Sequence, residues 1–160
     1  MAKEIKPGKK FKYGLESVLK VKEIREKKEQ EKFAVRQKEY YEEKTKEQQI
    51  QDEKKDQSSQ FKKIVGKGTM DFGKVLARRQ HLIVLKEALD AQIEKVIESS
   101  QKLEKQREKL LDAMKDRKII EKDKEHKLEK YNEVMKQYEI KFLDEVATLR
   151  FKREKSDINS

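Results

Sequence analysis

Apolar residues recur at alternating steps of three and four positions from Leu82 to Leu149. One series takes every seventh residue from Leu82, and a second takes every seventh residue from Ile93. Thirteen of the 19 positions in the two series are apolar, whereas the chain's 34% apolar content would give about six. This spacing is typical of the core positions of a coiled coil. It predicts one long helix, because neither Pro nor Gly interrupts the stretch.

A second helical pattern precedes this one. Apolar residues at helical spacing begin at Phe11, and Phe33, Tyr40 and Tyr41 anchor the charged tract that follows. The periodicity breaks between about Ser58 and Gly73, where three of the five glycines cluster. Two helices joined by one short glycine-rich break predict an antiparallel hairpin.

We therefore expect an all-α fold, a two-helix antiparallel coiled-coil hairpin with a longer second helix. Its expected parts are a flexible basic arm (1–10), a coiled coil (11–153) with helices at about 11–62 and 73–153 and a turn at about 63–72, and a tail (154–160). If the turn centres near Lys67, residue i faces roughly residue 134 − i. Leu15 would then lie opposite about Ile119, and Phe11 opposite Asp123.

The second helix extends beyond the first on this register. Its remaining part carries apolar residues with no expected partner in the chain: Leu128, Tyr131, Met135, Tyr138, Phe142 and Leu149. An apolar stripe exposed to water is typical of a binding surface. We therefore expect another molecule to cover it.

Composition restricts the class of protein. Charged residues make up 46% of the chain, aromatic residues 7%, and the mean hydropathy is −1.15. Such a chain cannot build a large compact core, whereas it can build a narrow interface between helices. Intrinsic disorder is the alternative for this composition, and the long heptad pattern disfavours it. The net charge of +10 is concentrated at the two ends and the middle of the chain.

The residues disfavour several kinds of chemistry. Without Cys, the chain has no disulfide, catalytic thiolate or zinc–cysteine site. The Val65–Thr69 stretch resembles a phosphate-binding loop only superficially, since GxxxxGK[ST] is absent. His81 and His126 are too far apart on one helix to share a metal, and the spacing of Asp123 and His126 is attributable to chance. We expect no enzyme, cofactor or metal, no membrane span and no secretory signal, and hence a cytoplasmic protein.

One group of residues stands apart from both heptad series. Leu85, Ala88 and Gln92 follow one another at helical spacing near the predicted turn. They are either part of a wider helix–helix interface or a docking patch on the outer face. The first interpretation is slightly favoured.

Three motifs resemble FliJ-type flagellar export proteins. The first is Phe11-Lys12-x-x-Leu15-Glu16-x-Val18-Leu19 followed by Arg25-Glu26. The second is Arg107-Glu108-x-Leu110-Leu111-x-Ala113 leading to Arg117-Lys118-x-x-Glu121. The third is Leu143-Asp144-Glu145-x-Ala147 through Arg150-Phe151. They occur in the family's order and cover nearly the whole chain.

This resemblance implies a cytoplasmic component of the flagellar type III export apparatus, at the basal body and inner membrane. Such proteins form a coiled-coil stalk that inserts into the hexameric export ATPase ring and promotes its assembly and activity. They link the ATPase to the membrane-embedded export gate and to substrate chaperones, and so serve motility and chemotaxis. The chain would meet the membrane only through these partners.

The resemblance and the unpartnered stripe together suggest two groups of site residues. The candidates for ATPase binding are Phe11, Leu15, Leu19, Tyr131, Tyr138, Phe142, Leu149, Arg150 and Arg153. The candidates for gate binding are Ile50, His81, Leu85, Ala88 and Gln92. The alternatives are the stalk of a virulence-type injectisome, a basic coiled-coil nucleic-acid binder, and a self-associating structural coiled coil. We expect no nucleic acid as the partner, since the helix shafts are close to neutral.

Overall fold

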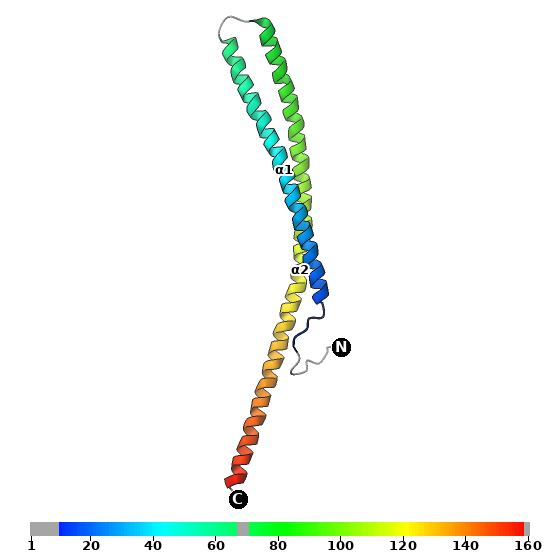
Figure 1. The fold of residues 1–160 in the computed structure, drawn as a ribbon, viewed down its shortest axis with the longest axis vertical. Coiled ribbons are helices and arrows are strands. Elements are labelled where there is room, and N and C mark those ends of the chain that lie inside the picture. Colours follow the sequence, from blue (N-terminus) through cyan, green and yellow to red (C-terminus); the bar gives the residue numbers. More distant parts are fainter. Residues whose placement is uncertain (1–9, 67–70, 159–160) are drawn as a thin grey trace. The chain divides into compact units, whose positions relative to one another are not determined.

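The computed structural model describes residues 10–66 and 71–158, with side chains as far as Lys152. In these residues the chain forms two helices, α1 (Glu16–Val65) and α2 (Phe72–Ile158), which are antiparallel neighbours (Figure 1). The predicted all-α fold with a longer second helix is confirmed. Neither helix, as far as it is described, has an apolar stretch long enough to span a bilayer.

Glycines and one aspartate mark the helix ends. α1 lies between Gly14 and Gly66 and contains neither Gly nor Pro. It begins five residues after the expected start, because residues 11–13 are not helical and 14–15 form a turn. Asp71 caps α2, since its Oδ1 accepts hydrogen bonds from the backbone N–H groups of Gly73 and Lys74 at 3.2 and 3.4 Å.

The remaining expected boundaries fall partly outside the described residues. The turn centre at Lys67 and all of the basic arm except Lys10 lie outside them. α2 runs past residue 153 into the expected tail and ends at Ile158 in the described chain.

The chain divides into two compact units, to which both helices contribute. One unit comprises Met1–Ile24 with Lys115–Ser160, and the other comprises Arg25–Met114. We call them the terminal unit and the hairpin unit.

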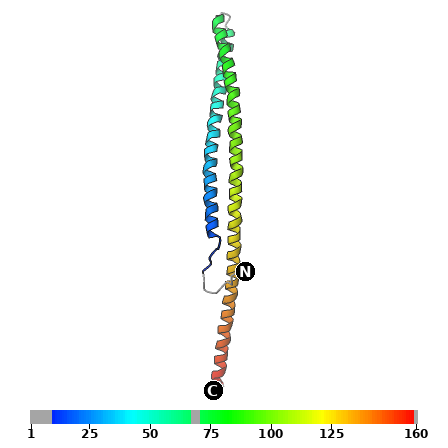
Figure 2. The ribbon, with the colours of Figure 1, turned by 90° about the vertical axis from the view of Figure 1, so that its right-hand side faces the viewer.

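The two helices of the hairpin unit lie side by side (Figures 1 and 2). Gln92 contacts Glu43, and Gln106 contacts Glu29, so the residue numbers of each pair total 135. This register lies one residue from the predicted relation of 134 − i. From the first pair to the second, the residue number rises on α2 and falls on α1, so the two helices are antiparallel.

The core of the hairpin unit corrects one of the two heptad series. Leu89 and Val96, from the series that starts at Leu82, are buried. The series from Ile93 is one residue late, because Gln92 is only 6% exposed while Ile93 is half-buried. The interface follows the helical spacing even where the residue at that position is polar. A search for apolar residues therefore selects the neighbour of the true core position.

The α1 side of this interface is polar. Phe33 and Tyr40 are half-buried, as expected of anchors, whereas Tyr41 is 59% exposed and packs edge-on against Tyr40 at a centroid distance of 5.6 Å. Glu47 is buried, and its carboxylate accepts hydrogen bonds from Lys44 and Gln51 at 2.8 and 3.1 Å. Both bonds lie within α1, so the buried carboxylate is satisfied by its own helix.

In the terminal unit, the start of α1 pairs with the middle of α2. Lys22 and Asp116 form an ion pair at 2.6 Å, and Glu16 and Lys124 form another at 2.8 Å. Leu19, which lies between Glu16 and Lys22 in the sequence, is buried at 6% exposure. Beyond about Tyr131, no second helix accompanies α2 in the described part of the chain (Figures 1 and 2).

Candidate functional site

The non-helical residues before α1 lie against α2. The rings of Phe11 and Tyr131 meet at a centroid distance of 5.6 Å, and both residues are half-buried. The predicted position of Phe11 opposite Asp123 is therefore wrong. A non-helical chain advances about 3.3 Å per residue where a helix advances 1.5 Å, so residues 10–13 reach further along α2. The part of α2 that extends beyond the rest of the described chain accordingly begins later than predicted.

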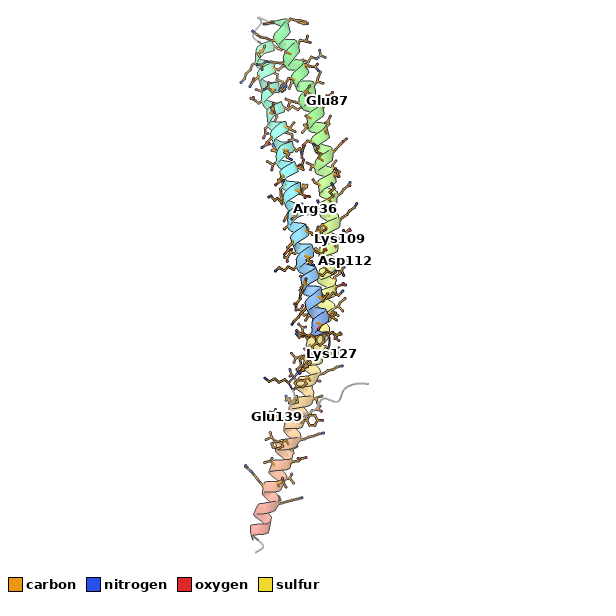
Figure 3. All side chains as sticks on the ribbon, turned by 45° about the vertical axis from the view of Figure 1, so that its right-hand side comes forward. Arg36, Glu87, Lys109, Asp112, Lys127 and Glu139 are labelled. Carbon is orange, nitrogen blue, oxygen red and sulfur yellow. The ribbon has the colours of Figure 1, made fainter. Side chains whose placement is uncertain are left out.

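Tyr13 anchors this segment. Its hydroxyl donates a hydrogen bond to Asp123 Oδ2 at 2.7 Å, and the carbonyl oxygen of Ile120 lies 3.1 Å away. Lys127, labelled in Figure 3, donates to the same carboxylate oxygen at 2.7 Å. Its ammonium nitrogen lies 5.4 Å from the centre of the Tyr13 ring. The ring, the carboxylate and the ammonium thus form one contact cluster, which we call the tyrosine anchor.

The anchor alters the titration of its members. Loss of hydration, followed by the hydrogen bond to Asp123, raises the pKa of Tyr13 to about 12. The hydrogen bond from Lys127, followed by that from Tyr13, lowers the pKa of Asp123. Both shifts favour a neutral phenol beside a charged carboxylate, which is the state that makes the hydrogen bond.

The other two N-terminal candidates for ATPase binding differ in exposure. Leu19 is buried, and therefore supports the helix pair rather than offering a free surface. Leu15 is 38% exposed, and Ile119, its predicted neighbour, is 66% exposed. Neither residue therefore belongs to the buried core of the helix pair.

The C-terminal candidates lie on one face of α2. Tyr138, Phe142 and Leu149 are 42%, 63% and 61% exposed, and their spacing of four and seven residues places them on the same side. We call these three residues the C-terminal stripe. Arg150 is also exposed, and the side chain of Arg153 lies outside the described residues.

A second apolar face of the same segment was not predicted. Ile140 and Leu143 are 50% and 62% exposed, and Ala147 follows them at helical spacing. Ile140 stands two residues from both Tyr138 and Phe142, which is about 200° around a helix. These three residues, which we call the opposite stripe, therefore point away from the C-terminal stripe. Glu139, labelled in Figure 3, belongs to the same stretch of helix.

The five candidates for gate binding do not share one exposed face. Leu85 and Gln92 are buried at 7% and 6% exposure, so the docking-patch interpretation is wrong for both. They belong to the helix–helix interface, the alternative that the sequence slightly favoured. Ile50 is half-buried.

The other two members of this set are exposed. His81 lies on the surface with its Nε2 3.7 Å from a carboxylate oxygen of Glu53, and Ala88 also faces solvent. In the described residues, no group of His, Cys, Asp and Glu side chains is arranged to hold a metal ion.

The sequence interpretation missed the tyrosine anchor and two glutamines, Gln92 and Gln106, that reach across the interface. Tyr13 gives no local signal, since its partner stands 110 positions away. The glutamines do leave a faint pattern, because Gln92 and Gln106 are spaced by 14 residues, as are Glu29 and Glu43.

These features define a two-helix antiparallel coiled coil with exposed apolar side chains on the extended end of its second helix. The family model for the flagellar FliJ protein matches residues 11–156. The chain therefore belongs to the FliJ family, a family of type III export proteins. A solved structure described as a YscO homolog, CT670, from Chlamydia trachomatis is 20% identical and covers 92% of this chain and 99% of its own, with a TM-score of 0.44. No curated protein sequence matches the chain.

Proposed function

We propose that this protein is the coiled-coil stalk of the flagellar type III export apparatus. In this proposal the end of α2 enters the ring of the hexameric export ATPase and promotes its assembly and activity. The protein acts as a binding partner without catalysis or a cofactor, on the cytoplasmic side of the basal body.

The observation that carries the proposal is the pair of apolar stripes on opposite faces of α2. A single partner helix covers one face and leaves the other in water. A helix inside a ring meets surfaces on more than one side, so both the C-terminal stripe and the opposite stripe can be covered. The chain belongs to the FliJ family, and the resemblance described above implies the hexameric export ATPase as the ring.

The energies are compatible with a moderate affinity. Burying a large apolar side chain contributes about 1.5–3 kcal/mol, so a few such residues supply the gross energy of a specific interface. Association and ordering costs offset much of this gain. A symmetric ring also cannot present a matching surface to one helix at every subunit, so charged contacts at Arg150 would supplement the apolar ones.

The proposal includes links to the export gate and to substrate chaperones, as the family resemblance implies. Of the gate candidates, His81 and Ala88 remain available on the surface. Leu85 and Gln92 would act only indirectly, by holding the helix pair together.

ATPase stimulation tests the stalk. The Tyr138→Ala, Phe142→Ala double variant should retain helicity, because both side chains are exposed, and should lose most stimulation of the purified ATPase. Ile140→Ala with Leu143→Ala should have the same effect if both faces are contacted. Val35→Ala with Ile97→Ala is the matched control, since it removes two apolar side chains of 56% and 53% exposure from the hairpin unit.

The same variants separate the proposal from its alternatives. Unchanged stimulation by both double variants would refute insertion of this segment. If the wild type is a tight dimer that both variants dissociate, the stripes mediate self-association instead. A truncation should be placed after Lys136 rather than after Glu121, because Asp123, Lys124 and Tyr131 hold the start of the chain.

A further inference from the structure

Two glutamines of α2 make the same pair of contacts with α1. The Gln92 amide nitrogen donates to the backbone carbonyl of Glu43 at 3.0 Å and to its carboxylate at 2.6 Å. The Gln106 amide nitrogen donates to the backbone carbonyl of Glu29 at 3.3 Å and to its carboxylate at 2.5 Å. Both glutamines are buried, at 6% and 8% exposure. We call each contact an amide clamp.

The repeat extends to the neighbours of each clamp. The second carboxylate oxygen of Glu43 accepts from Lys46, and that of Glu29 accepts from Lys32, at 2.6 and 2.7 Å. Each of these lysines follows its glutamate by three residues. The pKa of each glutamate is lowered, first by its lysine and then by its glutamine. Every clamp component therefore recurs after 14 residues, which is two heptads.

The positions between and beside the clamps fit the same register. On this register Ser99 is level with Arg36, and its hydroxyl donates within α2 to the Val96 carbonyl at 2.9 Å. Leu85 lies at the level of Ile50. In this alignment the two amides face carboxylates, and the level between them pairs the small Ser99 with Arg36, whose side chain is exposed and forms an ion pair with Glu39 on α1.

A slip of one heptad destroys this match in either direction. One slip brings Gln92 level with Arg36, and the other brings Gln106 level with Arg36 and Gln92 level with Ile50. The arginine side chain offers donors only, and isoleucine offers neither donor nor acceptor, so a buried glutamine amide would lose its carboxylate acceptor and keep at most a backbone carbonyl. A slip of two heptads restores only one clamp.

The apolar positions discriminate far less between these registers. Leu82, Leu89, Val96, Leu103 and Leu110 repeat every seven residues on α2, so a slip replaces one aliphatic residue by another. An apolar interface alone would therefore tolerate several alignments. Buried polar residues in coiled coils select one alignment at a cost in stability.

We propose that Gln92 and Gln106 are alignment-specifying residues, which fix the register of the hairpin unit rather than stabilise it. The two clamps act together, because their common spacing is satisfied only when residue numbers across the interface total 135. This device determines which residues of the two helices stand side by side along the hairpin unit.

Distances between nitroxide labels on the full chain test the proposal. The chain has no native cysteine, so Gln37→Cys with Lys86→Cys places labels at two exposed positions that differ in height along the pair. The labelled chain should give one narrow distance. The Gln92→Leu, Gln106→Leu double variant should retain helicity and unfold at a higher temperature. Its label distances should show a second population, in which one helix has shifted by one heptad, or about 10 Å, along the axis of the other. Dilution with unlabelled chain removes distances between molecules.

Ser99→Leu is the matched control, because it replaces a half-buried polar residue of the same heptad position that makes its hydrogen bond within its own helix. It should keep the single wild-type distance. If the double leucine variant also keeps only that distance, apolar packing sets the register and the proposal is overturned. It is equally overturned if the double variant loses helicity or unfolds at lower temperature, because the clamps would then be sources of stability.

Discussion

Tyr13 and Asp123 are separated by 110 positions in the sequence, yet the hydroxyl of one lies 2.7 Å from the carboxylate of the other. This hydrogen bond holds the residues before α1 on α2. It belongs to the terminal unit, whose extended helix end carries the two apolar stripes. The anchor therefore lies before Tyr131, beyond which no second helix accompanies α2 in the described part of the chain.

The anchor predicts a local effect of Tyr13→Phe. The ring would still pack beneath Lys127, but the hydrogen bond to Asp123 would be lost. Amide hydrogen exchange should rise about five- to tenfold in the first turn of α1, where the N–H of Glu16 bonds the Tyr13 carbonyl, and stay unchanged in the hairpin unit. Tyr41→Phe, at an exposed tyrosine, is the control and should leave exchange unchanged in both units. Uniform exchange changes along the whole chain would contradict a local anchor.

The same residue predicts a late step in the alkaline titration. The pKa of Tyr13 is raised from 10.0 to about 12, so its contribution to stability is complete below pH 10 and is lost as the pH rises through 12. Absorbance of tyrosinate should show one of the five tyrosines ionising late, and Tyr13→Phe should remove that step. Asp123→Asn should move it part of the way back, since loss of hydration would remain. A wild-type titration without a late step would refute the anchor.

At acid pH, stability is lost as the pH falls rather than as it rises. The pKa of Asp123 is lowered from 3.8, so its contribution is present above that pH and is lost as the pH falls below it. The pKa values of Glu29 and Glu43 are likewise lowered, from 4.5, so their contributions to stability are also lost as the pH falls below that value. Thermal unfolding temperatures should therefore fall as the pH is lowered from 5 to 2, and Asp123→Asn should make the terminal unit less sensitive. Exchange measured by segment distinguishes the two units.

Burial of Leu85 predicts a loss of stability on substitution. Leu85→Ala should lower the unfolding free energy by about 2–3 kcal/mol, because it removes a buried side chain and leaves a cavity. Val84→Ala, at a neighbouring residue that is 50% exposed, should change it by no more than about 0.5 kcal/mol. Chemical denaturation monitored by circular dichroism measures both. Equal effects of the two substitutions would show that Leu85 is not a core residue.

The heptad pattern predicted the helices more reliably than it predicted their faces. The series from Leu82 identified Leu89 and Val96 as core residues, because aliphatic residues occupy those positions. The second series failed at Gln92 because the core residue there is polar and an isoleucine follows it. The aromatic residues beyond Tyr131 were correctly expected to be exposed, since the first helix is too short to reach them. Tyr131 itself was not, because a non-helical segment covers more of α2 than a helix of equal length.

The sequence by itself determined the two helices, their antiparallel order and the extension of the second beyond the first. These follow from spacing, from the glycines around residues 66–73, and from the unequal lengths of the two patterns, all of which are local or additive properties of the chain. Only the tertiary structure decided that Leu85 faces inward, that Gln92 and Gln106 clamp glutamates, and that Tyr13 bonds Asp123. Each of those contacts joins residues 49 to 110 positions apart or depends on such a pairing. A side chain's burial is set by the atoms that meet it across the interface, and these are not specified by its neighbours in sequence.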